Sequence, residues 1–302
     1  KFKQSLSNEF DMKDLGDVHY LLGIQIKRNT TQRTIALSQQ LYIKKVIERF
    51  GMSESKPVSA PLDHGIKLAR SSSTNGNSHL DDSGKISYQS AIGTIMYVML
   101  ATRPDSSFAI TSLSQFSSCP SEEHWIAIKR VLRYLKGTMD YQLVYDGKSK
   151  RNPEVLTGYC DADWGNCTDD RRPITGFTFL IANCAVTWQT KKQPTVALSS
   201  VEAEYMSAAQ AAKEIIWLRC FLNELGELNL KSPSVILSDS NGSINLTKNP
   251  EHHGRSKHID IKHHFVREQV SAGNIVFKYV STEHMAADIL TVGDCAQGPV
   301  IR

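Results

Sequence analysis

The sequence is poor in cysteine and has no long apolar run. Its six cysteines are scattered along 302 residues without a Cys-x-x-Cys pair, which disfavours disulfides and zinc and predicts a reducing, intracellular compartment. The longest apolar stretch, 91–101, is too short to cross a bilayer, and the N-terminal stretch lacks the apolar centre of a signal peptide. No membrane partner is therefore expected. The chain begins without Met, so we expect a fragment of a longer protein.

Strong charge of either sign is also absent, because the formal net charge is +4 and charged residues make up 22% of the chain. This mild basicity permits a nucleic-acid partner without requiring one. Hydrophobic residues make up 40%, which is typical of a globular protein. The length leaves room for about two domains of roughly 150 residues each.

The first half of the chain is predicted to be mainly helical after an initial hairpin. Ser38 and Ser121 each precede an amphipathic run and are expected to cap a helix. Between Asp63 and Lys85 the pattern is lost, and the polar stretch 71–85 predicts a flexible linker. The expected elements are strands at 19–29 and 33–39 and helices at 38–52, 88–99, 103–117 and 121–135.

The second half changes to short strands separated by helices. Three strands come first and are expected to pair antiparallel, and a long Ala-rich helix capped by Ser199 follows them. This order predicts an α/β fold, with flanking helices over a mixed sheet. The expected elements are strands at 156–161, 176–182, 185–190, 234–239 and 274–280 and helices at 199–226, from about 241, 258–273 and 283–290.

Two acids spaced one residue apart end the first of these strands, in the stretch LTGYCDADWGN. Because residues i and i+2 of a strand point to the same face, Asp161 and Asp163 would lie together, which requires solvent or a cation. Further acids are Glu204 in the long helix, Asp239 at the end of the next strand and Asp288 within MAADIL. Sites in open α/β sheets form outside the carboxyl ends of strands, so Asp161 and Asp239 are expected to converge.

A cluster of carboxylates needs cations to balance it. Oxygen ligands suit Mg²⁺ or Mn²⁺, and two such ions activate water and stabilise the leaving oxygen in phosphodiester hydrolysis. Taken singly, each acid also has an ordinary explanation: a turn residue at 161, a helix N-terminal charge at 204, a helix cap at 239 and a surface charge at 288. Asp288 fits its explanation least well, because apolar residues flank it.

Five stretches carry these acids and their surroundings: GYCDADWGNCTDDRRPITGF, WQTKKQPTVALSSVEAEYMSAAQAAKEIIWLR, LSDSNGSINLTKNP, RSKHIDIKHHFVRE and HMAADILT. In this order they resemble the ribonuclease H domain at the end of the Pol polyprotein of copia-type retrotransposons. Upstream, FDMKDLGDVHYLLGIQIKR, IALSQQLYIKKVIERFGM, YQSAIGTIMYVMLATRPD and HWIAIKRVLRYLKGT resemble the end of the reverse transcriptase of the same polyprotein.

The resemblance implies a ribonuclease H-like mixed sheet preceded by a mainly helical reverse-transcriptase segment. The paired-Asp motif of the polymerase would lie before Lys1, and the sequence after Thr291 departs from the family. The parts expected are the end of the palm and start of the thumb at 1–62, a flexible linker at 63–86, a helical thumb or connection at 87–150, the ribonuclease H domain at 153–291 and an unrelated tail at 292–302.

Carried over to this sequence, the resemblance implies that Asp161, Glu204, Asp239 and Asp288 are the catalytic acids and the metal ligands. Asp163 becomes a neighbour of the first ligand. Ser199 and Ser200 are placed where the family contacts 2′-hydroxyls, although helix capping explains Ser199 equally well. Basic residues in loops beside the strands are candidate phosphate contacts, with solvent exposure as the alternative. They are Lys191, Lys192, Arg171 and Arg172.

The implied function is Mg²⁺-dependent cleavage, with Mn²⁺ as a possible substitute, of the RNA strand of an RNA–DNA hybrid. The hybrid and the remainder of the Pol polyprotein would be the partners, in the cytoplasm or in the virus-like particle of an intact element. The alternative is a catalytically inactive, nucleic-acid-binding remnant of a decayed element. Intact acids favour the enzyme, whereas the missing polymerase residues and the unusual tail favour the remnant.

Overall fold

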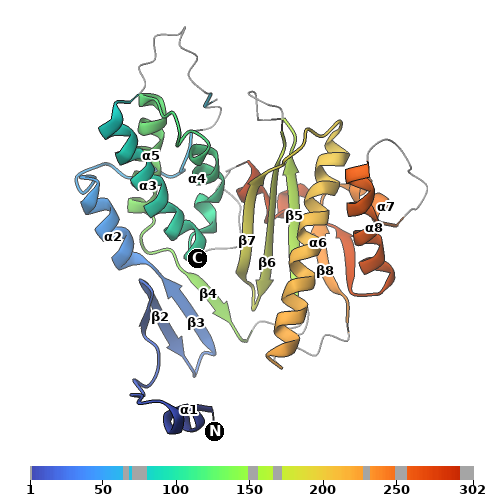
Figure 1. The fold of residues 1–302 in the computed structure, drawn as a ribbon, viewed down its shortest axis with the longest axis horizontal. Coiled ribbons are helices and arrows are strands. Elements are labelled where there is room, and N and C mark those ends of the chain that lie inside the picture. Colours follow the sequence, from blue (N-terminus) through green and yellow to red (C-terminus); the bar gives the residue numbers. More distant parts are fainter. Residues whose placement is uncertain are drawn as a thin grey trace.

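The computed structural model describes residues 2–63, 68–69, 80–148, 156–165, 172–226, 232–248 and 257–292. The strands form two sheets, one of four and one of five strands. In Figure 1 the smaller sheet lies below a group of helices on the left, and the larger sheet with its own helices lies on the right.

The smaller sheet is antiparallel and contains the expected hairpin, which closes at the pair Asn29 and Thr34. Its fourth strand lies far along the chain and pairs with the second hairpin strand through Leu37 and Leu143. The sequence patterns did not predict this strand. In order across the sheet, the strands are β1 (Tyr20–Leu21), β2 (Ile24–Asn29), β3 (Thr34–Ser38) and β4 (Leu143–Asp146).

The helices beside the smaller sheet share one apolar core, in which Ile43, Ile95, Leu113 and Leu132 are almost fully buried. These residues come from four different helices, so burial of their apolar faces holds the group together. The helical elements are α1 (Phe2–Glu9), α2 (Gln40–Arg49), α3 (Asp82–Ala101), the 3-10 helix η1 (Pro104–Ser106), α4 (Ser107–Ser114) and α5 (Glu122–Gly137).

Several helix boundaries differ from the predicted ones. The helix predicted at 103–117 forms η1 and α4 and ends at Ser114. Helix α3 begins at Asp82 rather than at 88, because the Asp81 carboxylate accepts a hydrogen bond from the Gly84 amide (2.7 Å) and caps it. The helix therefore includes the end of the expected linker, of which 64–67 and 70–79 lie outside the described residues. Gln39 is the N-terminal boundary residue of α2, although the Ser38 hydroxyl does accept a hydrogen bond from the Gln40 amide. Ser121 caps α5 as predicted.

The larger sheet is mixed and has the strand order β7-β6-β5-β8-β9. Strands β5, β6 and β7 pair antiparallel, as predicted, whereas β8 and β9 run parallel to β5. The carboxyl ends of β5 and β8 therefore lie at the same edge. The strands are β5 (Thr157–Asp163), β6 (Ile174–Ile181), β7 (Cys184–Lys192), β8 (Ser234–Ser238) and β9 (Ile275–Tyr279).

Helices cover the larger sheet, and alternate residues of β5 contact different cores. Cys160 packs in the core that contains Tyr205 and Ile215 of α6, whereas Tyr159 packs against the segment from Met285 to Ala287. Because β5 is covered on both faces, it is buried along almost its whole length. The helical elements are α6 (Ser200–Glu224), α7 (Asn241–Lys248), α8 (Lys257–Ser271), the 3-10 helix η2 (Thr282–His284) and α9 (Asp288–Thr291). This architecture confirms the predicted α/β fold class.

The helix expected at 283–290 is wrong as a single helix. The chain forms η2, passes through extended backbone at Met285 and resumes helical structure in α9. The residues between the two short helices, Met285 to Ala287, are buried beside Tyr159 and Leu180. Burial of this apolar segment against the sheet outweighs the helix propensity of its alanines.

Side-chain hydrogen bonds join the helical group to the edge strand of the larger sheet. The Trp188 indole of β7 donates to the Met99 carbonyl of α3 (3.2 Å), and the Tyr145 hydroxyl of β4 donates to the Ala185 carbonyl (2.7 Å). Next to these contacts α4 packs against both β7 and α9. The two parts of the chain therefore contact each other directly.

Candidate active site

Asp161 lies near the end of β5 and is almost fully buried. Its backbone pairs with Gly176 of β6, and its carbonyl accepts a hydrogen bond from the Ser207 hydroxyl of α6 (2.7 Å). One carboxylate oxygen, Oδ2, accepts a short hydrogen bond from the Thr291 hydroxyl of α9. The backbone and one side-chain oxygen are therefore held by different elements.

Gly176 permits the close approach of α9 to the sheet. A Cβ atom at this position would lie 2.7 Å from Thr291 Cγ2 and 2.9 Å from Leu290 Cβ, which is closer than side-chain carbons pack. The Thr190 hydroxyl of β7 also donates to the Leu290 carbonyl (2.8 Å). These contacts fix the position of the Thr291 hydroxyl beside Asp161.

Glu204 and Asp239 approach Asp161 from α6 and from the end of β8. The first turn of α6 is capped by Ser199, whose hydroxyl accepts a hydrogen bond from the Glu202 amide (3.2 Å), as predicted. This cap sets the start of the helix and thus the face on which Glu204 lies. Asp239 directly follows β8, and its Oδ2 accepts a hydrogen bond from the Thr282 hydroxyl (2.7 Å).

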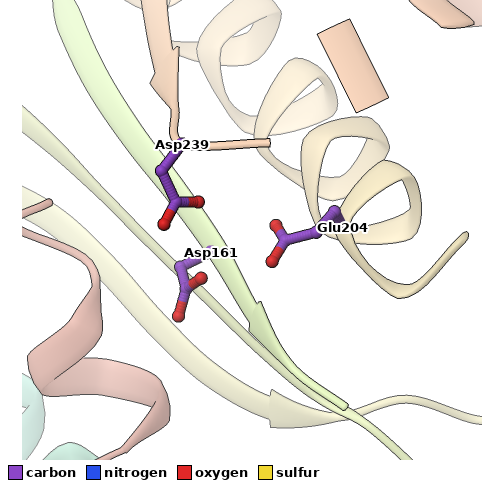
Figure 2. A group of neighbouring side chains, drawn as sticks. All are labelled: Asp161, Glu204 and Asp239. Carbon is purple, nitrogen blue, oxygen red and sulfur yellow. The ribbon is translucent and has the colours of Figure 1, made fainter. Parts of the chain in front are cut away.

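The three carboxylates converge (Figure 2), and one oxygen of each lies within 4.8 Å of the others. Burial, together with repulsion from Asp161 and Asp239, raises the pKa of Glu204 to about 9. Burial also raises the pKa of Asp161, and the negative charge of Asp239 adds to this effect, while the Thr291 hydrogen bond opposes it. Both shifts arise first from burial and then from the negative charge of the neighbouring acids.

This donor set fits a divalent cation. Within the described part of the chain, none of the three acids forms an ion pair with a lysine, arginine or histidine. Glu204 Oε2 is buried and has no hydrogen-bond partner among the described residues. A buried carboxylate oxygen without a donor costs free energy unless a ligand satisfies it. Hard oxygen ligands of this kind suit Mg²⁺ or Mn²⁺.

Asp288 and Asp163, the other two acids singled out in the sequence, lie outside this group of three. Asp288 is the first residue of α9, the same short helix that carries Thr291, and it is half-buried. Asp163 Oδ1 accepts a hydrogen bond from the Gly165 amide (3.1 Å). The predicted role of Asp288 as a fourth ligand stays a prediction.

Of the residues predicted to contact nucleic acid, those that the structure describes lie around the same edge of the sheet. Ser199 and Ser200 are exposed at the start of α6. The strand register aligns Asp163 with Ile174 and Ile174 with Lys192, so Lys191 and Lys192 lie at the sheet end that carries the acids. Lys192 donates a hydrogen bond to the Gln115 side chain (2.9 Å), whereas Lys191 is exposed. Arg172 is exposed, and Arg171 lies outside the described residues.

Three hydroxyl-bearing residues around the acids were not identified from the sequence. Ser207, Thr282 and Thr291 donate hydrogen bonds to Asp161 or to Asp239. Thr291 could have been suspected, because it belongs to the stretch DILT that carries Asp288. Ser207 lies within an Ala-rich helix and Thr282 begins the short helix η2, and nothing in the local pattern distinguishes them.

The chain was compared with protein families, with known proteins and with solved structures, and it is similar to parts of reverse transcriptases and Pol polyproteins. Residues 1–64 match the family model for reverse transcriptase (RNA-dependent DNA polymerase). The retrovirus-related Pol polyprotein from transposon TNT 1-94 of Nicotiana tabacum is 43% identical over 291 residues, covering 96% of this chain and 22% of the relative. The corresponding polyprotein from transposon RE2 of Arabidopsis thaliana is 39% identical over 287 residues, covering 95% and 19%.

A putative transposon Ty5-1 protein of Saccharomyces cerevisiae is 34% identical over 216 residues, covering 71% of this chain and 67% of the yeast protein. Among solved structures, LC11-RNase H1 in complex with an RNA/DNA hybrid is 14% identical with a TM-score of 0.34, covering 45% of this chain and 93% of that one. The foamy viral protease-reverse transcriptase dRH in complex with double-stranded DNA is 11% identical with a TM-score of 0.47, covering 88% and 38%.

In the described part of the chain, a five-stranded mixed sheet carries three converging acids, and the sequence before it matches a reverse transcriptase. The chain belongs to the retrovirus-related Pol polyproteins of transposons, which confirms the family that the motifs predicted. It spans about a fifth of the length of the two plant polyproteins. No helix in the described ranges combines the length and apolar content needed to cross a membrane.

Proposed function

We propose that this chain cleaves the RNA strand of RNA–DNA hybrids by metal-dependent hydrolysis. The observation that carries the proposal is the group formed by Asp161, Glu204 and Asp239. One oxygen of each lies within 4.8 Å of the others, and none forms an ion pair with a basic side chain among the described residues. A protein that needed these acids only for stability would gain by pairing them with a cation of its own. Their convergence at the carboxyl ends of β5 and β8 supports a site rather than a structural role.

Each residue of the group has a defined task in this proposal. Asp161, Glu204 and Asp239 would hold Mg²⁺, or Mn²⁺ in its place, with Asp288 as a fourth carboxylate from α9. When bound, two such ions activate water and stabilise the leaving oxygen of a phosphodiester. Thr291 keeps Asp161 Oδ2 occupied, so that Oδ1 faces the ligand, and Thr282 does the same for one oxygen of Asp239.

The substrate is assigned from the polar and basic residues around the acids. Ser199 and Ser200 are exposed beside the helix turn that carries Glu204, where hydroxyl groups suit contacts to the 2′-hydroxyls that distinguish RNA from DNA. Lys191 and Lys192, with Arg172 and Arg171, would contact phosphates of the hybrid. The remainder of the Pol polyprotein would be the protein partner, in the cytoplasm or in a virus-like particle.

The domain organisation belongs to the same proposal. The hairpin and α2 would be the last part of a polymerase palm and the start of its thumb, and α3 to α5 would be the thumb or connection. The proposed parts are 1–62, the linker 63–86, the helical segment 87–150, the ribonuclease H domain 153–291 and the tail 292–302.

Cleavage of a labelled RNA–DNA hybrid by the purified chain tests the function. We expect the RNA strand to be cut with Mg²⁺, but not with EDTA and not by the Asp239→Asn variant, which should still bind the hybrid. Metal-independent cutting, or unchanged cutting by this variant, would contradict the mechanism. Hybrid binding without any cutting by the folded wild type would instead support the inactive remnant.

A further inference from the structure

An exposed tryptophan directly follows the strand that carries Asp161. The side chain of Trp164 is 49% exposed, although β5 ends one residue earlier with buried and half-buried positions. Its indole nitrogen donates a hydrogen bond to the carbonyl of Ala197 (3.0 Å). Ala197 is itself buried against Ala162 of β5 and Ala203 of α6. The indole is therefore fixed in place while much of its ring surface faces solvent.

The segment bonded to Trp164 adds further exposed apolar surface. Leu198 is 83% exposed and Val196 is 50% exposed, and the chain then continues into Ser199 and Ser200 at the start of α6. The backbone of this segment is held as well, because the Leu198 amide donates to Glu202 Oε2 (2.7 Å). Glu204 follows within the next turn of the helix. The apolar side chains thus lie on the segment that follows Asp161 and on the segment that precedes Glu204.

The charges around these apolar side chains select the kind of partner. Exposed Arg172 and Lys191 lie at the same end of the sheet, by the register of β5, β6 and β7. Cations beside the surface suit a polyanion, and rigid aromatic rings suit the flat faces of bases and sugars. A nucleic-acid strand offers both features along one chain. It also places a phosphodiester at the acids, which an apolar protein partner would not do.

We propose that Trp164 and Leu198 form an apolar contact surface for the sugar and base faces of the nucleic-acid strand next to the scissile phosphate. This inference rests on the proposed function and adds a specific recognition element to it. In a hybrid, the wide, shallow minor groove exposes sugar edges that such a surface can touch. Contact through the ring faces complements the hydroxyl contacts of Ser199 and Ser200 and the phosphate contacts of the basic residues.

Hybrid binding in a cleavage-deficient background tests this surface. The full-length Asp239→Asn chain with Mg²⁺ is titrated with a fluorescent RNA–DNA hybrid at fixed salt, alone and combined with Trp164→Ala, Trp164→Phe or Leu198→Ala. Trp217→Ala is the matched control, because Trp217 is also exposed (57%) but lies in the C-terminal half of α6, stacked on Phe221. Thermal midpoints of all variants are measured in parallel.

We expect Trp164→Ala to weaken hybrid binding about tenfold, as for loss of an aromatic stacking contact. Trp164→Phe should recover most of the affinity, Leu198→Ala should lose about threefold, and Trp217→Ala should bind like the parent. Leu198→Ala and Trp217→Ala leave the hydrogen bond from Trp164 to Ala197 in place, so the comparison does not depend on the stability of Trp164→Ala. Equal affinities of parent, Trp164→Ala and Leu198→Ala would overturn the proposal.

Three further outcomes separate this inference from the proposed function. Wild-type cleavage together with unchanged binding by the Trp164 and Leu198 variants would overturn the contact surface alone. A parent that binds no hybrid at all would overturn both. Absence of cleavage together with the expected losses in binding would remove the enzymatic function and leave the contact surface supported.

Discussion

Two regions of this molecule bury charged groups, and they balance that charge differently. In the helical group, Arg103 is fully buried with Asp105, and its guanidinium donates to both carboxylate oxygens (2.6–3.1 Å). The Tyr134 hydroxyl also donates to Asp105 (2.6 Å), and a further guanidinium nitrogen donates to the Thr138 carbonyl (2.9 Å). At the larger sheet, three acids converge without any ion pair among the described residues.

The difference indicates what each cluster is for. A buried ion pair that is fully hydrogen-bonded holds its surroundings in one arrangement, because removal of either partner leaves an uncompensated charge. Here it joins the start of η1 to the end of α5. The group of Asp161, Glu204 and Asp239 has no ion pair among the described residues, and in the proposed function a bound cation balances its charge. The contacts of the two clusters therefore separate a structural ion pair from a candidate site.

The largest effect is expected for Asp161→Asn. This variant keeps the shape of the side chain but removes the central carboxylate, and a loss of several kcal/mol of metal-derived stabilisation corresponds to a rate decrease of about a thousandfold. Single-turnover cleavage of an RNA–DNA hybrid measures it. Asp163→Asn is the matched control, because Asp163 lies two residues away and outside the group of three. A similar rate decrease in both variants would argue against a special role for Asp161.

Arg103→Met should be the most destabilising of these changes, because it leaves Asp105 buried without its cation. The expected decrease in the free energy of unfolding is about 3–5 kcal/mol, measured by urea denaturation. Arg133→Met is the control, since Arg133 donates its hydrogen bond to Lys56 at an exposed position, and it should change stability by less than about 1 kcal/mol. Equal effects of the two substitutions would contradict the structural role of the buried pair.

Thr291→Val should weaken Mg²⁺ binding about tenfold, because the residue that orients a ligand is lost while its volume is kept. Calorimetric titration with Mg²⁺ measures this affinity, and Thr291→Ser should restore most of it by returning the hydroxyl. Thr190→Val serves as control, because Thr190 donates to the backbone of the same helix and not to a carboxylate. If Thr291→Ser binds Mg²⁺ as weakly as Thr291→Val, the hydroxyl does not orient Asp161.

The smallest effect is expected on the thermal stability of Glu204→Gln in the absence of metal. The pKa of Glu204 is raised from 4.5 to about 9 in the folded state, so folding favours its protonated form. The stability that this group contributes is complete below about pH 4.5 and is lost as the pH rises towards 9. In EDTA, Glu204→Gln should therefore unfold a few degrees above the wild type at pH 8, with a smaller difference at pH 5. Saturating Mg²⁺ should remove this difference between the unfolding temperatures of the variant and the wild type. A difference that does not vary with pH would contradict the assigned cause.

Much of the larger sheet could be predicted because its signals are local. Alternating apolar residues located β5, β6 and β7, and Ser199 located the start of α6. The pairing of β4 with β3 could not be predicted from the sequence, because more than a hundred residues separate the two strands in the chain. The break between η2 and α9 also escaped prediction, since it depends on burial of Met285 to Ala287 against β5.

The acids of the candidate site were found because carboxylates on apolar backgrounds are unusual. Asp161, Glu204 and Asp239 were each singled out in the sequence, and the structure brings them together. The hydroxyl groups that orient them were missed, because serine and threonine occur everywhere on a protein surface and within helices. Their roles depend on distances between elements, such as that between α9 and β5, which no local pattern encodes.

The most direct test of this account is a calorimetric titration of the metal-free chain with Mg²⁺ at pH 7, beside Asp239→Asn. The wild type should bind Mg²⁺ saturably and release protons, because the pKa of Glu204 is raised to about 9 in the metal-free protein. The variant should lose most of this binding. No saturable binding by the folded wild type, or the same binding by the variant, would contradict the claim that the acids await a cation.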